Sequence, residues 1–60
     1  MIPPDTLRIR VGKLLEEKGI DQTADLLQLK VETIYRLANG DQVKPVSINL
    51  AEARLKELRR

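Results

Sequence analysis

The stretch KVETIYRLANGDQVKP, residues 30–45, decides the fold that we expect for this chain. Ile34 and Leu37 are spaced as neighbours on one face of a helix, and polar residues occupy most of the positions around them. Asn39 and Gly40 follow directly, and both residue types tolerate the left-handed conformation in which helices end. The stretch therefore predicts a short helix whose outer face is polar, partly basic and suited to lie against another molecule.

A longer helix is predicted near the start of the chain. Prolines disfavour the α conformation in the residues before them, so residues 1–4 should form an extended arm. Asp5 offers an N-cap side chain, and Gly19 offers a C-terminal stop. Gly12 in mid-helix costs about 1 kcal/mol relative to alanine, which indicates close backbone packing there. The inward face at helical spacing comprises Leu7, Val11, Leu14, Leu15 and the methylene stem of Lys18.

Two short helices are predicted in the middle of the chain. Asp21 can cap the first, which runs to about Gln28 with Ala24 and Leu27 turned inward. The second covers about residues 31–38. The alternative for the Asn-Gly pair is a tight hairpin turn, although the residues before it show little of the alternation that a strand needs.

The C-terminal third allows two elements. Residues 43–48 alternate enough for a short strand, which Pro45 would confine to a sheet edge. A last helix should begin at Ser47 or Asn49, since Asn49 and Glu52 have the spacing of a capping box. Its apolar stripe is Ala51, Leu55 and Leu58, and Arg59 and Arg60 should lie at the negative end of its dipole. The predicted fold class is therefore all-α, a compact bundle of about four short helices.

Composition narrows the function. A chain of 60 residues forms one small domain of marginal stability, which a partner subunit would help. It has no cysteine or histidine, so we expect no disulfide, metal site, cofactor or enzyme activity. No apolar run is long enough to span a membrane or serve as a secretory signal, which favours a cytoplasmic, intracellular protein. Tyr35 is the one aromatic residue, too little to form a stacking platform for single-stranded nucleic acid.

Net charge gives a mixed signal. The whole chain carries +2, from 11 basic and 9 acidic residues. Residues 20–47, however, hold three basic side chains against four acidic ones, so the positive excess lies in the flanking segments. This distribution counts against a simple electrostatic mode of DNA binding.

The middle of the chain resembles the helix-turn-helix of phage Cro and lambda-type repressor proteins. In such a motif a small residue lets two helices cross steeply, and apolar residues hold the second helix against the first. The segment EEKGIDQ, residues 16–22, also resembles the joint between the first two helices of that family. The resemblance covers roughly residues 7–50 and rests on Ala24, Ile34, Leu37, Asn39, Gly40 and Pro45.

The resemblance implies one helix-turn-helix domain over residues 1–60. Its parts would be an arm at 1–4, the motif at 21–38 and a C-terminal helix at 49–60. Two features depart from the family pattern: the first helix of the motif is short, and Gln28 occupies the turn position that is usually glycine. A non-glycine residue there costs about 1–2 kcal/mol. The segment also resembles the motifs of Fis-like and excisionase-like proteins, but the latter usually add a β-wing.

The function implied is that of a sequence-specific transcription regulator, a Cro-like repressor that binds double-stranded DNA. The second helix of such a motif lies in the major groove, while cationic and polar side chains around it contact phosphates. Candidates for base contacts are Val31, Glu32, Thr33, Tyr35 and Arg36. Candidates for phosphate contacts are Gln22, Lys30, Asn39 and Lys44.

Three alternatives stay open at this point. Glu32 and Arg36 could form an ordinary intrahelical pair, and Tyr35 could pack on the edge of the domain. The whole domain could also be a protein-interaction module, since fold does not fix function. Because the motif has few cations, a DNA-binding chain should act as a homodimer on a near-palindromic operator. The predicted dimer surface is Leu50, Leu55 and Leu58 on the last helix.

Overall fold

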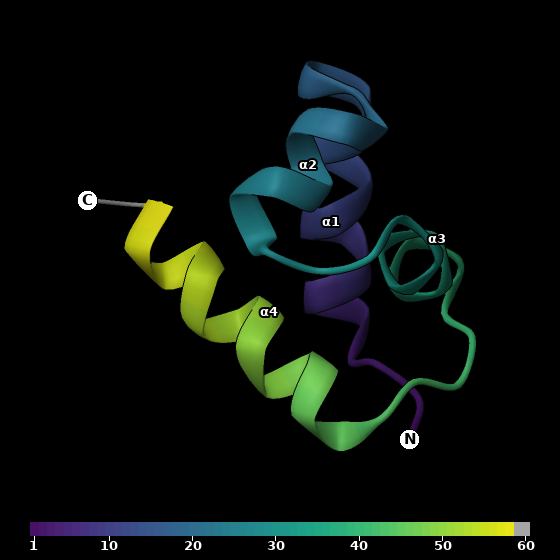
Figure 1. Cartoon of the computed structure of the whole chain (residues 1–60). Helices are drawn as coiled ribbons and strands as arrows, with labels where there is room; N and C mark the ends of the chain where they lie inside the picture. The colour runs from purple at the N-terminus through teal and green to yellow at the C-terminus, as the bar shows by residue number, and fades with distance from the viewer. Residues whose placement is uncertain (59–60) are drawn as a thin grey trace.

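Four α-helices account for most of residues 1–58, the part of the chain that the computed structural model describes (Figure 1). These residues contain no strand, so the all-α fold class is confirmed and the possible edge strand at 43–48 is absent. None of the described helices is both long enough and apolar enough to cross a membrane. The helices are α1 (Asp5–Lys18), α2 (Ile20–Leu27), α3 (Val31–Asn39) and α4 (Pro45–Leu58).

The last helix begins earlier than the sequence indicated. It starts at Pro45, so Ser47 and Asn49 are helical residues and the predicted capping box is wrong. Proline suits the first position of a helix because that position needs no backbone N–H donor and favours the φ angle of the ring. The alternation in 43–48 was therefore the first turn of a helix. Arg59 and Arg60 lie outside the described residues.

The joints between helices use left-handed or glycine-specific backbone. Gly19 alone separates α1 from α2, with φ 83° and ψ 168°. Gln28 begins the three-residue turn between α2 and α3 with φ 55° and ψ 43°, as predicted for this turn position. Gly40, at φ 77°, ends α3, so the Asn-Gly pair closes a helix and is not a hairpin turn.

The core lies where the four helices meet. Helix α1 packs on α2 and α3, and α2 packs on α3 and α4. In Figure 1, α3 is seen nearly end-on beside α1, and α4 runs across the opposite side of the bundle. The buried apolar residues are Leu7, Val11, Leu27, Ile34, Leu37, Val43, Ile48, Ala51 and Leu55, with Leu14, Leu15 and Ala24 packed at the margin.

Several local predictions were wrong. Asp5 is the first residue of α1 and not its cap, and Asp21 lies inside α2, which follows directly on Gly19. Lys18 is exposed. A methyl group at Gly12 would meet nothing within 4 Å, so close backbone packing does not explain that glycine. Thr23, which we did not predict, is fully buried, and its hydroxyl donates a 2.7 Å hydrogen bond to the Gly19 carbonyl.

The N-terminal arm is extended, as predicted, and it is attached to the loop before α4. The backbone N–H of Val43 donates to the Met1 carbonyl at 2.9 Å, and the Met1 amino group donates to the Val43 carbonyl at 2.9 Å. Pro3, within the arm, is buried. The arm thereby fixes the loop that leads from α3 into α4.

Candidate nucleic-acid interface

Helix α3 presents its polar side to solvent. Ile34 and Leu37 are fully buried, which fixes the rotation of the helix about its axis. Glu32, Tyr35 and Arg36 are exposed as a result. The helix is therefore held from behind by two apolar side chains and is free in front.

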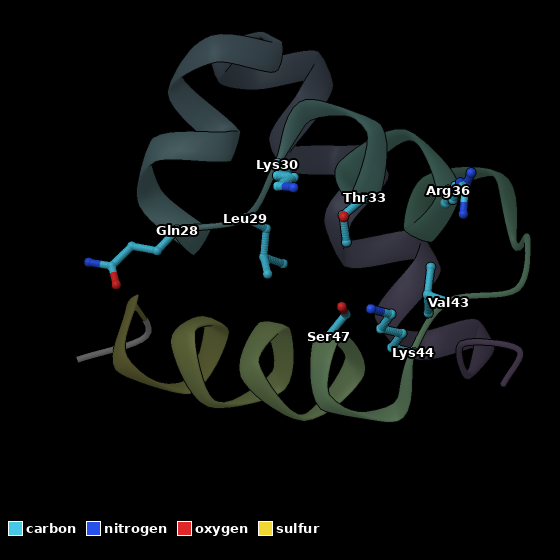
Figure 2. A pocket seen from close by; sticks show the side chains of 8 residues that line it. All are labelled: Gln28, Leu29, Lys30, Thr33, Arg36, Val43, Lys44 and Ser47. Carbon is cyan, nitrogen blue, oxygen red and sulfur yellow. The ribbon is translucent and has the colours of Figure 1, made fainter.

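A groove lies between α3 and the first turn of α4 (Figure 2). These two helices pack less closely than the pairs that form the core, which leaves a hollow of about 330 Å³ between them. Figure 2 shows the Thr33 side chain of α3 and the Ser47 side chain of α4 on opposite sides of it. Its lining residues are Gln28, Leu29, Lys30, Thr33, Arg36, Val43, Lys44 and Ser47.

The groove gathers positive charge from three different segments. Lys30 belongs to the turn before α3, Arg36 to α3 itself and Lys44 to the loop before α4. No carboxylate of residues 1–58 lines it. The two acidic side chains of α2, Asp21 and Asp25, line a neighbouring hollow that shares Gln28, Leu29 and Lys30 with the groove. Arg36 and Lys44 therefore lie in a groove without carboxylates, and Lys30 lies between the groove and the acidic hollow.

The groove takes up some of the predicted contact residues and leaves others outside. Thr33, Arg36, Lys30 and Lys44 all line it, whereas Val31 lies on the Asp21 side of the turn. Four further candidates are exposed but do not line the groove: Glu32, Tyr35, Gln22 and Asn39.

Two polar residues of the groove, Gln28 and Ser47, were missed as candidates, as were the apolar Leu29 and Val43. Ser47 was assigned to a cap, and Gln28 only to a turn, because their place beside α3 depends on where α4 begins. An earlier start of α4, read from proline at a first helical position, would have brought Ser47 to notice.

The structure bears on the alternative roles that the sequence left open for side chains of α3. Within residues 1–58 the one salt bridge joins Arg8 to Asp5 at 3.6 Å, so Glu32 and Arg36 do not form the intrahelical pair. Tyr35 is 47% exposed and is not part of the core. Lys30 precedes α3 and makes no side-chain capping bond.

The predicted dimer residues divide among different environments. Leu55 is only 6% exposed and belongs to the core, so its assignment to a dimer surface is wrong. Leu58, 44% exposed, lines a hollow between α1 and α4 together with Leu14. Leu50 is 40% exposed and faces away from the core.

The turn at Gln28 is supported by a contact with α4. The Gln28 side-chain oxygen accepts a hydrogen bond from the Arg54 guanidinium at 2.7 Å, on the surface of the protein. A surface bond of this kind contributes about 1 kcal/mol. The left-handed backbone of a non-glycine residue costs about 1–2 kcal/mol, so the two effects oppose each other.

Gln28→Gly should therefore leave the domain folded and no less stable. Glycine removes the strain of the left-handed backbone and loses the bond to Arg54. Thermal unfolding followed by circular dichroism measures the balance, and Arg54→Met, which removes only the bond, is the matched control. A clear fall in the Tm of Gln28→Gly, larger than that of the control, would show that the turn does not carry this strain.

Comparisons with protein-family models, with curated proteins and with solved structures found no match for this chain. The groove and the exposed face of α3 are therefore the features that bear on its function.

Proposed function

We propose that this chain is a sequence-specific regulator of transcription that binds double-stranded DNA through a helix-turn-helix. In this proposal α2 and α3 are the two helices of the motif, and α3 lies in the major groove. Two copies bind a near-palindromic operator, and the resemblance to Cro-like proteins favours a repressor that acts in the cytoplasm. The observation that carries the proposal is the groove beside α3, with cations from three segments and no carboxylate among its described lining residues.

The arrangement suits a duplex because it combines two kinds of contact. Lys30 and Lys44 flank the exposed helix and can neutralise phosphates, which set the position of the protein on DNA without reading sequence. Arg36, in the last turn of α3, can donate two hydrogen bonds to one guanine. Glu32 can accept from cytosine, and Thr33 can bond to several bases. Affinity and sequence preference thus come from neighbouring but separate side chains.

Binding to random duplex DNA should be weak and should fall steeply with salt. Each phosphate contact changes the logarithm of the binding constant by about 0.9 per logarithm of salt concentration, so the two contacts of Lys30 and Lys44 give a slope of about −2 per chain. Fluorescence anisotropy of a labelled duplex between about 50 and 200 mM salt measures this slope. Affinity that does not depend on salt, or no binding at low salt, contradicts the proposal.

Lys44→Gln should reduce the size of that slope by about 1 and weaken binding to all sequences alike, as expected for a lost phosphate contact. Lys13→Gln is the matched control: it removes the same charge from an exposed position on α1 that lines a different hollow. Equal effects of the two substitutions would show that only net charge matters and that the groove is not the binding surface.

The salt titration distinguishes DNA binding from a protein-interaction function, and the secondary structure after the motif bears on a second alternative. A protein-interaction module on this scaffold would bind no random duplex, and its supporting observation is the exposed apolar surface of α4. An excisionase-like architecture needs a β-wing after the motif, and residues 41–48 instead form a loop and the start of α4. Selection of bound sequences from random duplex DNA should recover a near-palindrome if two copies bind.

A further inference from the structure

Helix α4 is apolar on two opposite sides. One side packs into the core through Ile48, Ala51 and Leu55. The other side, facing solvent, carries Val46, Leu50 and Ala53, of which Val46 is 57% and Leu50 40% exposed. Residues at spacings of three and four share one face of a helix. A helix that is apolar on both faces is usually covered on both.

Charge along the exposed stripe is distributed unevenly. Residues 45–51 contain no charged side chain, and Glu57 continues the line of Val46, Leu50 and Ala53 at the far end. Lys44 precedes the helix at the near end. The stripe is therefore apolar in its first half, with a cation and the positive end of the helix dipole at its start, and acidic at its finish.

We propose that this stripe binds the same stripe of a second copy, with the two α4 helices antiparallel about a two-fold axis between Leu50 and Ala53. The inference rests on the proposed function, whose homodimer it places on a specific surface. In this arrangement the large Leu50 meets the small Ala53 of the other copy. Glu57 faces Val46 in the first turn of the other α4, at the positive end of that helix dipole. A two-fold contact requires a surface that complements itself, and this one does.

The parallel arrangement is disfavoured by the same charges. It would set Glu57 against Glu57 at one end and leave the cationic ends together at the other. Like charges that face each other across an interface oppose association. The antiparallel register avoids both contacts, so the charges at the two ends of the stripe fit a second copy of this chain in that orientation.

The groove stays open in such a dimer. Ser47 lines the groove and points toward α3 in Figure 2, whereas Val46 and Leu50 are exposed to solvent. The contact is small, because stable interfaces bury about 800 Å² per partner, and the described chain exposes 4291 Å² in all. One helical stripe supplies less area than a stable interface buries on each partner, so the dimer should be weak in free solution.

Sedimentation equilibrium of the intact chain at high micromolar concentration tests the inference. The natural sequence should show a monomer–dimer equilibrium. Leu50→Glu should weaken association about tenfold or more, which corresponds to about 1.4 kcal/mol. Leu58→Glu, an equally exposed leucine on a different side of α4, should leave it nearly unchanged. A chain that stays monomeric throughout, or a dimer lost only with Leu58→Glu, overturns the proposal.

A second variant keeps the test informative if Leu50→Glu does not fold, and circular dichroism shows whether each variant is folded. Glu57→Lys changes an exposed residue outside the core and places a cation against the positive end of the other helix. It should also weaken the dimer, and an unchanged dimer would contradict the antiparallel register. Anisotropy with random duplex DNA separates the two proposals. A monomer that binds DNA overturns this inference alone, and a dimer that binds no DNA overturns only the DNA-binding function.

Discussion

Ile34→Ala should lower the free energy of unfolding by about 3 kcal/mol, the largest effect of a single substitution that we expect. Ile34 is fully buried where α3 meets the core. Truncating such a side chain to alanine typically costs 2–5 kcal/mol, and we expect a loss of roughly 3 kcal/mol here. A chain of 60 residues has a total stability of about 3–9 kcal/mol. Alanine is a better helix former than isoleucine, so the loss comes from packing and not from helix propensity.

Urea denaturation followed by circular dichroism measures this loss. Ile34→Val, which removes one methylene, should cost about 1 kcal/mol and stay folded, so the series remains informative if the alanine variant is unfolded. Tyr35→Ala, the neighbouring exposed residue, should change stability by no more than about 0.5 kcal/mol. Similar effects of Ile34→Ala and Tyr35→Ala would mean that α3 is not held by the face we describe.

Gly19→Ala should destabilise the protein by about 1–3 kcal/mol, the second largest effect that we expect. Gly19 has φ 83° and ψ 168°, a backbone region that is essentially restricted to glycine. A methyl group there would meet nothing within 4 Å, so the cost comes entirely from the backbone. The residue alone joins α1 to α2, and its carbonyl accepts the Thr23 hydroxyl bond. Strain here therefore reaches both helices.

Gly12→Ala is the matched control for this glycine. It makes the same chemical change inside α1, where the backbone is helical and a methyl group also meets nothing within 4 Å. It should stabilise the protein by up to about 1 kcal/mol. Thermal unfolding of both variants should thus give shifts of opposite sign. A stabilising Gly19→Ala would show that the joint between α1 and α2 adopts another conformation.

Much of the fold followed from periodicity and from the residues that end helices. The spacing of Ile34 and Leu37 gave the inward face of α3, and Gly19 and Gly40 end helices where expected. The start of α4 could not be predicted in this way. A proline in an alternating segment is compatible with an edge strand and also with the first turn of a helix. Thr23 was missed because threonine is mostly an exposed residue. Inside a helix its hydroxyl can donate to the carbonyl four residues earlier, here that of Gly19, and this bond allows the side chain to be buried.

The candidate site was predictable in part. The exposed side of α3 follows from its two inward residues, but the groove depends on the path of the chain from Gly40 to α4. That path brings Lys44 and Ser47 beside Thr33 and Arg36. A count of charges along the chain could not show that Asp21 and Asp25 lie outside the groove that Arg36 and Lys44 line. Leu55 was assigned to the dimer surface because it lies three residues before Leu58. The side of α4 that carries Leu55 packs into the core instead.

The most direct test of the central claim is an amide NMR titration of the nitrogen-labelled chain with random duplex DNA at low salt. The groove and the face of α3 should bind the duplex, so the largest shifts should fall on residues 28–36 and 43–47. Residues of α1 near Lys13 should change little. Shifts confined to α1, or no shifts at duplex concentrations well above that of the protein, would contradict DNA binding by this surface.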